Sequence, residues 1–373
     1  MKKVMIMYST GGMGHKKAAI ALEEAFKRAG GVEIKLVDTL DYGDKLYKFL
    51  YTDAYVLMMT KLKTIWGILY GFSDLGPIGR LLFRFRESFD IKSLPGLDKM
   101  ILAEKPDAIV TTHFILPAIA KTLRMNPEMK AKFYVSVTDY GPHSFWIAPG
   151  IDKYFVGSES MVPLMKAKGV PLSKVVVTGI PAVENFIKEY DTAKLRKEFG
   201  LLPGKRTIFT LSGGFGVGPM EEILKALSGV KTEIQVIAVS GYNKQLFESI
   251  SAMKKDLPYP VMALGFSDRI AELMSVSDLM ITKAGGISVT EAMNMRLPMI
   301  LIGSIPGQES WNEELLVSNG AAEKASSIRD IPDIVNRVLL SDEAYERLKE
   351  GINKVRKPKA ADEIARTVLE EMA

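Results

Sequence analysis

Residues 4–29 read VMIMYSTGGMGHKKAAIALEEAFKRA, which places an apolar run, a glycine-rich turn and an amphipathic segment in direct succession. The run Val4–Tyr8 has the length and composition of a strand that is buried on both faces. The glycines favour a tight turn, and the segment from His15 to Ala29 favours a helix. A strand that passes through a turn into a helix is half of a βαβ unit, so this stretch predicts a parallel sheet.

The same alternation continues along the chain. Further apolar runs occur at residues 32–38, 108–112, 133–137, 153–156 and 175–178 and, after the break Gly179-Ile180-Pro181, at 207–211, 234–239, 261–263, 279–282 and 299–302. This pattern predicts two doubly wound α/β domains, the first over residues 1–180 and the second over 181–357. The terminal segment, residues 358–373, is expected to form a helix over 360–372 that returns to the first domain.

Composition excludes several classes of protein. The 373 residues are 47% hydrophobic, which rules out disorder and fibrous structure, and the chain has no cysteine, so disulfides, thiolate metal sites and a cysteine nucleophile are ruled out. The net charge of +5 favours an anionic partner: nucleic acid, nucleotide phosphates or an acidic lipid surface. The N-terminus lacks the features of a secretory signal, and no run predicts a spanning helix, so we expect a cytoplasmic protein.

Residues 42–90 depart from the alternation because aromatic and basic side chains are interleaved there. The aromatic residues are Tyr47, Phe49, Tyr51, Tyr55, Trp66, Tyr70, Phe72, Phe83 and Phe85, and the basic ones are Lys45, Lys48, Lys61, Lys63, Arg80, Arg84 and Arg86. This mixture is typical of a membrane interface. The alternative is a helical insertion whose aromatic residues are core and whose cations are solvated.

Familiar nucleotide and metal signatures are absent. Lys17 and Pro219 stand where the third glycine of a dinucleotide fingerprint belongs. The sequence also has no Walker lysine loop, no H-E-x-x-H and no D-x-D pair. Standard NTPases, zinc proteases and metal-dependent nucleotide-sugar enzymes are therefore disfavoured.

The turn Ser9–His15 predicts a cradle for an anion or a substrate, because backbone N–H groups and the positive end of a helix converge there. The alternative is a tight turn that needs glycine for backbone reasons alone. His15 stands at the mouth of this turn and is one of three histidines in the chain. With an ordinary pKa of about 6.5, a histidine at this place could act as a general base near neutral pH.

Three segments of the second domain carry ligand-binding chemistry. Residues 211–218 form a second glycine-rich turn after a strand, so two glycine turns could face each other across a cleft with phosphates between them. Residues 282–291 place two glycines before a helix whose first turn is expected to carry Glu291, which either accepts ribose hydroxyl hydrogen bonds or only favours the helix N-terminus. The segment 306–312, PGQESWN, is dense in groups that bind polyols, with an ordinary helix start as the alternative.

Taken in order, these motifs resemble the diacylglycerol glycosyltransferase family. This family comprises monogalactosyldiacylglycerol synthases and processive diacylglycerol glucosyltransferases, and it is related to the lipid II-forming N-acetylglucosaminyltransferase. The matching stretches cover nearly the whole chain: residues 11–19, 138–139 with His143 and Trp146, 152–154, 178–181, 212–216, 282–291 and 306–309.

The resemblance implies a GT-B fold, in which two Rossmann-like doubly wound domains face each other across a cleft. It implies an inverting, metal-independent transfer of glucose or galactose from a UDP-sugar to the hydroxyl of diacylglycerol. It further implies no cofactor, no nucleic-acid partner and a peripheral position on the anionic inner face of the cell membrane. The stretch Gly286-Ile287-Ser288 is closer to the peptidoglycan relatives and leaves the donor sugar open.

Carried over by position, the resemblance assigns catalytic roles to His15, Asp139 and Glu309. The expected substrate-binding residues are Gly12, Gly14, His143, Ser212, Gly213, Gly214, Phe215, Gly216, Phe266, Lys283, Gly285, Gly286, Glu291 and Gln308. In this set the turn 212–216 would touch the diphosphate and Glu291 the ribose, while Gln308 and Glu309 would hold sugar hydroxyls. The expected membrane-facing residues are Trp66, Phe83, Arg84, Phe85 and Arg86.

Two other classes of function stay open. An enzyme that uses UDP-N-acetylglucosamine, either a 2-epimerase or a peptidoglycan-type transferase, would share the fold, although an epimerase needs no lipid-facing insertion. A non-catalytic sugar-nucleotide sensor would keep the glycine turns and Glu291, but His15 and Glu309 weigh against it.

Overall fold

The computed structural model describes residues 1–11, 13–54, 57–58, 62–74, 76–212, 218–304, 307 and 309–372, without the side chains of residues 53, 63, 64, 66 and 76–84. The chain divides into two compact units. The first unit contains Met1–Glu184, Pro306–Trp311 and Lys357–Ala373, and the second contains Asn185–Ile305 and Asn312–Arg356.

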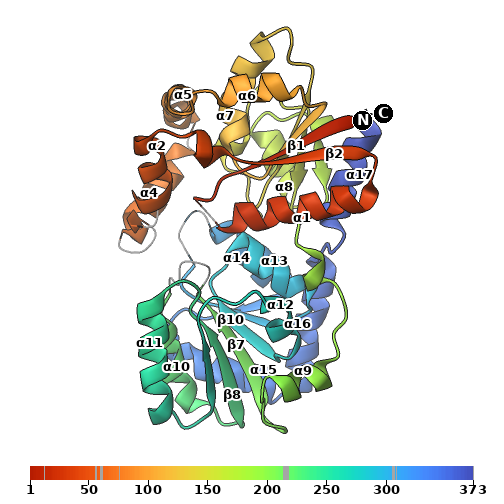
Figure 1. Cartoon of the computed structure of the whole chain (residues 1–373). Helices are drawn as coiled ribbons and strands as arrows, with labels where there is room; N and C mark the ends of the chain where they lie inside the picture. The colour runs from red at the N-terminus through yellow and green to blue at the C-terminus, as the bar shows by residue number, and fades with distance from the viewer. Residues whose placement is uncertain are drawn as a thin grey trace. The chain divides into compact units, whose positions relative to one another are not determined.

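The first unit is built on a parallel sheet that, within the described residues, has six strands in the order β2-β1-β3-β4-β5-β6. Its strands β1 and β2 lie side by side (Figure 1). The strands are β1 (Lys2–Tyr8), β2 (Val32–Asp38), β3 (Ala108–Thr111), β4 (Lys132–Ser136), β5 (Lys153–Val156) and β6 (Val175–Val177). The first strand lies between β2 and β3, with Val4 opposite both Ile34 and Ala108. The apolar runs predicted as strands in this half of the chain are confirmed.

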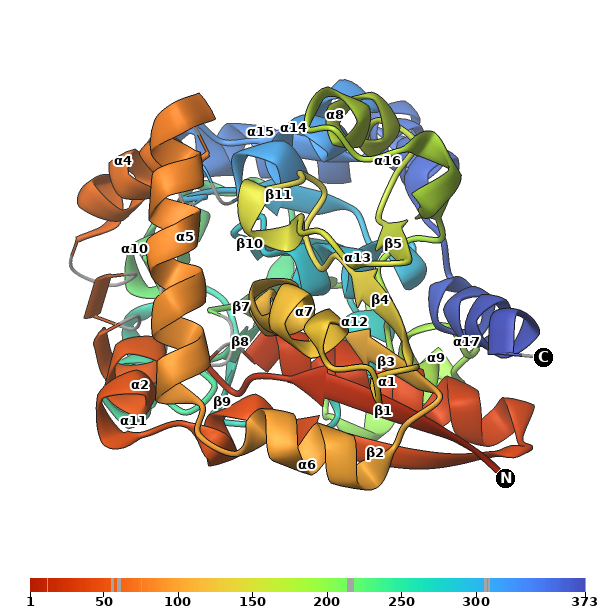
Figure 2. The same cartoon turned by 90° about the horizontal axis from the view of Figure 1, so that it is seen from above.

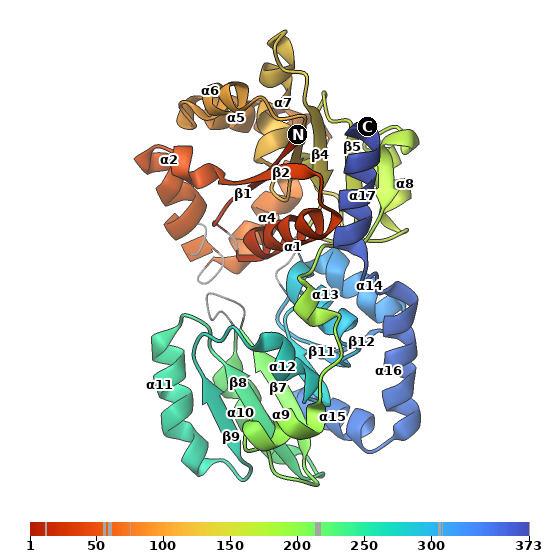
Figure 3. The same cartoon turned by 45° about the vertical axis from the view of Figure 1, so that its right-hand side comes forward.

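Both faces of this sheet are covered, which is why its strands read as continuous apolar runs. Val4 and Ile6 pack with α1 (Met13–Ala29) and α17 (Ala360–Met372), which lie side by side (Figure 3). Met5 and Met7 point to the opposite face, where they pack with α6 (Leu97–Glu104) and α7 (Ile115–Met125). After β5 come α8 (Met161–Ala167) and short 3-10 turns at Leu172–Lys174 and Glu184–Phe186.

The segment between β2 and β3 is helical (Figure 2). It runs through a 3-10 turn (Thr39–Tyr42), α2 (Lys45–Phe49), a π-helical turn (Leu50–Ala54), α4 (Lys63–Ser73) and α5 (Gly76–Ser93). Its aromatic residues divide into two groups, since Tyr47 is fully buried whereas Phe49, Phe72 and Phe85 are more than half exposed. The segment is therefore partly core and partly surface.

The second unit has its own parallel sheet, in which the described residues form six strands in the order β12-β11-β10-β7-β8-β9. The strands are β7 (Arg206–Leu211), β8 (Ile234–Val239), β9 (Val261–Leu264), β10 (Leu279–Thr282), β11 (Met299–Leu301) and β12 (Ala322–Lys324). Its helices are α9 (Thr192–Glu198), α10 (Met220–Ala226), α11 (Lys244–Met253), α12 (Ile270–Ser275), α13 (Gly286–Asn294), α14 (Ser310–Ser318, whose first two residues group with the first unit), α15 (Ile331–Leu339) and α16 (Asp342–Val355).

The structure adds one strand to those predicted in this unit and corrects the expected place of Glu291. The edge strand β12 reads Ala-Glu-Lys and pairs with β11 alone, so it lacks the apolar run that marks the buried strands. Glu291 is the sixth residue of α13, and the first turn of that helix has no acidic residue. An electrostatic role of Glu291 at the helix N-terminus is therefore excluded, because that effect is confined to the first turn.

Candidate active site

The site of the first unit lies where the strand order of its sheet reverses. Strand β1 has β2 on one side and β3 on the other, and ligands of doubly wound sheets bind beyond the carboxyl ends of the strands at such a point. His15 is the third residue of α1, the helix that follows β1, and the residues after β3 are Thr112 and His113. Residues nearly a hundred positions apart therefore meet at one edge of the sheet.

The contacts of His15 determine which of its ring nitrogens carries the hydrogen. Nδ1 of His15 lies 2.6 Å from the backbone oxygen of Thr112, and because a carbonyl only accepts, Nδ1 donates. Thr138 Oγ1 lies 3.2 Å from the same nitrogen, and Thr112 Oγ1 donates to the backbone oxygen of His15 at 2.8 Å. In the neutral ring this leaves Nε2 with its lone pair, which is the form a general base needs.

Burial lowers the pKa of His15 to about 4, although the hydrogen bond to Thr112 opposes the shift. The ring is therefore neutral over the whole physiological pH range. The expectation of an ordinary pKa near 6.5 is wrong because the sequence does not show that the turn is packed against β3 and its following residues.

His113 is the closest aromatic neighbour of His15 among the described residues, with ring centroids 4.6 Å apart in an edge-to-face arrangement. Burial, with the positive charge that His15 and Arg86 would add, holds the pKa of His113 well below its usual range. Phe114 and Trp146 complete the surroundings of His15, with centroids 6.3 Å and 6.1 Å away. The sequence led us to interpret His113 as structural and gave Phe114 no role, although both lie just after β3 at the carboxyl edge of the sheet.

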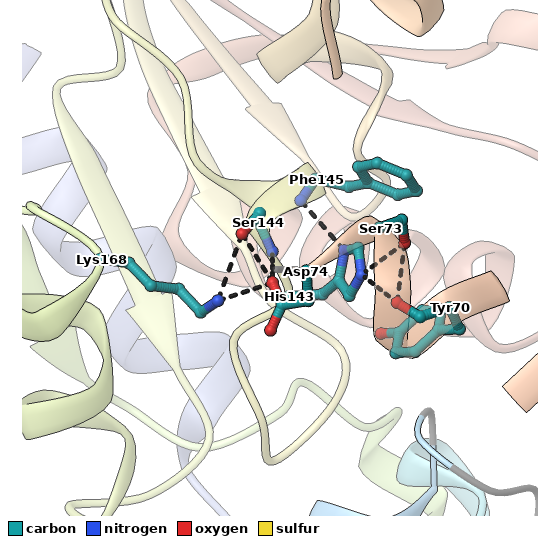
Figure 4. A network of polar contacts seen from close by, with 7 residues as sticks. All are labelled: Tyr70, Ser73, Asp74, His143, Ser144, Phe145 and Lys168. Atoms are coloured by element: carbon teal, nitrogen blue, oxygen red, sulfur yellow. Dashed lines mark hydrogen bonds and ion pairs between the residues drawn. The ribbon is translucent and has the colours of Figure 1, made fainter. Parts of the chain in front are cut away.

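His143 has both ring nitrogens engaged (Figure 4). The backbone N–H of Phe145 donates to Nδ1 at 3.1 Å, so the ring hydrogen is on Nε2, which faces Ser73 Oγ at 3.1 Å and the backbone oxygen of Tyr70 at 3.2 Å. Burial lowers the pKa of His143 to about 4, with the charge of Asp74 opposing the shift. In this structure His143 therefore joins the end of α4 to the segment after β4.

The same junction contains an ion pair (Figure 4). Asp74 accepts from Lys168 Nζ at 2.6 Å, from the Ser144 hydroxyl at 2.6 Å and from the Ser144 backbone N–H at 2.8 Å. Burial favours the protonated carboxyl, but these hydrogen bonds outweigh it and lower the pKa of Asp74. The C-terminal end of α4 is thus fixed by a charged carboxylate.

Three other residues of the expected site lie in the same unit: Asp139, Gly14 and also Glu309, which was expected to hold sugar hydroxyls in the second domain. Asp139 is half-buried and follows Thr138, which contacts His15. Gly14 is in the first turn of α1, beside His15. Glu309 is buried and belongs to the short segment 306–311 that groups with the first unit, where the side chain of Trp311 lies against Gly141, so closely that a Cβ added there would be 2.2 Å from the indole.

The residues expected at the donor site follow the strands of the second sheet. Ser212 comes directly after β7, Lys283 and Gly285 lie between β10 and α13, and Gly286 is the first residue of α13. Because β7 and β10 are adjacent where the strand order reverses, these segments share one edge of the sheet. Glu291 is buried on α13.

Phe266, which follows β9, stacks on Tyr242, which follows β8, with ring centroids 4.5 Å apart and an interplanar angle of 15°. Both rings are more than half exposed at the carboxyl edge of this sheet. Sequence reasoning missed Tyr242. The expected substrate-binding residues that lie outside the described part of the chain are Gly12, Gly213, Gly214, Phe215, Gly216 and Gln308.

One of the residues expected to face the membrane is placed elsewhere by the structure. The side chain of Arg86 is 12% exposed and pairs with Asp90, which is fully buried, so the guanidinium is part of the interior. Phe85, by contrast, is 67% exposed. The side chains of Trp66, Phe83 and Arg84 lie outside the described residues.

Among the described residues, no helix is long and apolar enough to cross a membrane. No group of three or more His, Cys, Asp or Glu side chains in the described ranges comes together so that it could hold a metal ion.

Two family models match the chain. Residues 15–182 match the model of monogalactosyldiacylglycerol (MGDG) synthase, and residues 219–367 match the glycosyltransferase family 28 C-terminal domain. Over 383 aligned residues the chain is 28% identical to a processive diacylglycerol beta-glucosyltransferase of Bacillus thuringiensis, covering 99% of this chain and 94% of that protein.

Solved structures share the architecture. MurG of Acinetobacter baumannii aligns over 99% of this chain and all of its own, with a TM-score of 0.62 at 14% identity. S. aureus MnaA in complex with UDP aligns over all of this chain and 97% of its own, with a TM-score of 0.66 at 16% identity. These likenesses confirm the expected fold class, two Rossmann-like units of the GT-B type.

Proposed function

We propose that this chain, whose two halves match the MGDG synthase and family 28 glycosyltransferase models, transfers glucose from UDP-glucose to the free hydroxyl of diacylglycerol with inversion at the anomeric carbon. The Bacillus thuringiensis relative is a diacylglycerol beta-glucosyltransferase by name, which supports glucose over galactose.

The observation that carries the proposal is the tautomer of His15. Its Nδ1 hydrogen is held by the carbonyl of Thr112, so Nε2 keeps its lone pair in a ring that is neutral at physiological pH. This is the arrangement that base-assisted attack by a hydroxyl requires.

In the proposed step the diacylglycerol oxygen forms a bond to the anomeric carbon while the bond from that carbon to the diphosphate oxygen of UDP breaks. The hydroxyl proton passes to Nε2 of His15, and UDP leaves with the electron pair of the broken bond. A base with a pKa of about 4 suffices, because the attacking oxygen becomes strongly acidic as its new bond forms. The single displacement produces inversion.

The leaving diphosphate is best placed at the N-terminus of α13. That helix has nine residues and no acidic residue in its first turn, and it begins at Gly286, where a backbone without a side chain allows close approach. The first turn of α10, in contrast, carries Glu221 and Glu222, which would repel an anion. Lys283, just before α13, adds a positive charge near the same end, and Glu291 is assigned to the ribose.

No metal ion is assigned to this reaction. The sequence has no D-x-D pair of the kind that would hold a cation on a nucleotide-sugar diphosphate. Backbone N–H groups and the helix dipole are proposed to stabilise the charge that develops on UDP instead.

We assign the lipid-facing role to the apolar face of α4. Ile65, Ile68, Leu69 and Phe72 have the spacing i, i+3, i+4 and i+7, so they lie on one face of the helix, and all four are between 49% and 54% exposed. Leu46 and Phe49 of α2 are also more than half exposed. Apolar surface of this extent in one segment supports docking onto a partner that covers it.

An anionic bilayer is the occupant to which we commit. The proposed acceptor is a lipid, and Lys45 and Lys48 of α2 are exposed beside the apolar residues of the same helix, where each cation would gain about 1 kcal/mol at an anionic surface. We therefore propose that the enzyme is peripheral on the inner face of the cell membrane.

The test is incubation of the full chain with diacylglycerol in vesicles or mixed micelles and with UDP-glucose, UDP-galactose or UDP-N-acetylglucosamine in turn. Glucosyldiacylglycerol of β configuration, formed with stoichiometric UDP from α-linked UDP-glucose, is the expected result. Product of α configuration would refute inversion. Galactolipid as the sole product would show that the donor is UDP-galactose and not UDP-glucose. Conversion of UDP-N-acetylglucosamine without any lipid product would instead support the epimerase.

A further inference from the structure

Arg86 and Asp90 form a buried ion pair one turn apart on α5. Nε of Arg86 donates to Asp90 Oδ2 at 3.1 Å. Taking both charges out of water is costly, and such a pair is often no more stabilising than apolar residues of the same size. The pair therefore calls for a role other than stability.

Arg86 holds Phe114 in two ways. Its Nη2 donates to the backbone oxygen of Phe114 at 2.9 Å, and its guanidinium carbon lies 4.1 Å from the centroid of the Phe114 ring. The same carbon lies 4.4 Å from the centroid of Phe145. A planar, delocalised cation makes these contacts simultaneously, whereas the ammonium of a lysine is a point charge that cannot.

Phe114 in turn belongs to the surroundings of His15. Its ring centroid is 3.8 Å from that of His113 and 6.3 Å from that of His15. It also lies 5.9 Å from Trp146. The position of Phe114 therefore affects the space around the proposed base.

A second connection runs from Asp90 to the other side of the His15 turn. The Tyr51 hydroxyl donates to Asp90 Oδ1 at 2.9 Å. The backbone oxygen of Tyr51 lies against Gly11, so closely that a Cβ added there would be 2.3 Å from it. Gly11 lies in the turn that leads into α1, the helix of His15, so the contacts form a circuit from this turn through Tyr51, Asp90, Arg86 and Phe114 back to His15.

We infer that Arg86 is a positioning residue for His15 and that the helical segment 42–90 has a second role besides lipid docking. Through this circuit α5 and the π-helical turn set the place of His15 and of the aromatic residues around it. The inference rests on the proposed function, because it assumes that His15 takes the acceptor proton. By this inference Arg86 affects the rate of the reaction and not the attachment of the protein to the membrane.

The test compares two charge-preserving substitutions on one helix. Arg86→Lys keeps the positive charge but loses the planar guanidinium with its several N–H donors. Lys92→Arg, at an exposed position of α5, is the matched control. We expect Arg86→Lys to lower kcat by about tenfold or more, since a small misplacement of reacting groups is enough for this. UDP affinity, vesicle binding and all properties of Lys92→Arg should stay at wild-type values. Wild-type kcat in Arg86→Lys, or loss of vesicle binding in parallel with kcat, would overturn the assignment.

A double-mutant cycle tests the route through Phe114. Phe114→Leu removes the cation–π contact and keeps an apolar side chain, so it should lower kcat as Arg86→Lys does. The double variant should then be no slower than the slower single variant. If the two losses multiply, Arg86 does not act through Phe114.

The chain has three histidines, so ring-labelled histidine NMR provides a readout that needs no turnover. Arg86→Lys should shift the signals of His15 and His113, identified by substitution, whereas Lys92→Arg should leave them in place. Unmoved His15 signals would refute the positioning role even in a folded variant. If wild-type protein makes no glycolipid, the proposed function fails by itself, and the NMR result still decides whether Arg86 controls His15.

Discussion

His15 has two properties that an exposed histidine lacks. One ring nitrogen is committed to a backbone carbonyl, and burial keeps the ring neutral. His113 lies 4.6 Å away, and a positive charge on His15 would add to the burial that already lowers the pKa of His113, so the two rings are not protonated together. The site therefore holds a weak base in one tautomer.

Removal of this base should reduce turnover without affecting donor binding. His15→Ala is expected to lower kcat by about 10² to 10⁴, the range that general-base catalysis contributes. UDP affinity, measured by calorimetry, should remain within about twofold, because UDP is assigned to the second unit. A variant with full turnover would take His15 out of the chemistry.

The pH profile should show the lowered pKa. The active form is the neutral ring, so kcat/KM should decrease as pH falls through about 4, the pKa of His15, and stay level above about 5. At pH 5 a ring with a pKa of about 4 is about 90% neutral, whereas a ring at about 6.5 would be only about 3% neutral. A titration of kcat/KM with a midpoint near 6.5, in protein that remains folded by circular dichroism, would contradict this assignment.

At the scale of the element, α4 is fixed at one end and apolar along one side. Its C-terminal end is held by Ser73 on His143 and by Asp74 on Lys168 (Figure 4). Its face of Ile65, Ile68, Leu69 and Phe72 is half exposed. A helix with a fixed base can present this face to a lipid surface without first becoming ordered, which reduces the entropic cost of docking.

Polar substitutions on this face should weaken membrane binding. The triple variant Ile68→Gln, Leu69→Gln, Phe72→Gln is expected to sediment with anionic vesicles at least about tenfold more weakly, because each side chain loses part of a burial free energy of about 1.5 to 3 kcal/mol. Leu202→Gln, at an exposed leucine of the second unit, is the control. Equal sedimentation of both variants would show that this face does not meet lipid.

His143 should make the stability of the protein pH-dependent. Its pKa of about 4 in the folded state lies below the value of about 6.5 in the unfolded chain, so the unfolded state binds more protons between these pH values. The stabilisation is therefore complete above about pH 6.5 and is lost progressively as pH falls through 4. His143→Asn, which keeps an acceptor for the Phe145 N–H, should lose about 2 kcal/mol less unfolding free energy than wild type between pH 7 and pH 5. Urea titrations in which wild type and His143→Asn lose the same unfolding free energy between pH 7 and pH 5 would refute this.

For the whole molecule, each doubly wound sheet collects its functional residues at one edge, beyond the carboxyl ends of its strands. In the first unit this edge holds His15 and His113, and in the second it holds Lys283 and the start of α13. Such edges bring together backbone N–H groups and helix N-termini, which can stabilise an anion without a cation.

Activity should accordingly survive chelation of metal ions. With an excess of EDTA, glycolipid formation is expected to remain near its untreated rate, because the leaving diphosphate is assigned to the helix dipole and N–H donors. Abolished activity that returns on addition of Mg²⁺ or Mn²⁺ would contradict the metal-free mechanism. Urea unfolding in the same buffer distinguishes loss of catalysis from loss of structure.

Local pattern was enough for most of the fold. Buried parallel strands are short apolar runs, and the alternation of these runs with amphipathic segments predicted β1 to β11 and the helix at Ala360–Met372. The edge strand β12 was missed because it is buried on too little of its surface to need apolar residues. Glycine turns and a histidine at the end of β1 likewise pointed to His15 before any contact was known.

The sequence by itself thus determined which elements form and which residue types stand at the ends of the strands, because these depend on neighbours a few positions apart. Tertiary structure alone decided which of those residues meet. Strand order brings His113 to His15, and packing of α5 against α7 takes Arg86 into the interior beside Phe114 while Phe85, its neighbour in the chain, remains at the surface. The local sequence does not show that Arg86 is buried and Phe85 exposed. Burial, tautomer and pKa are set by atoms that come from distant parts of the chain.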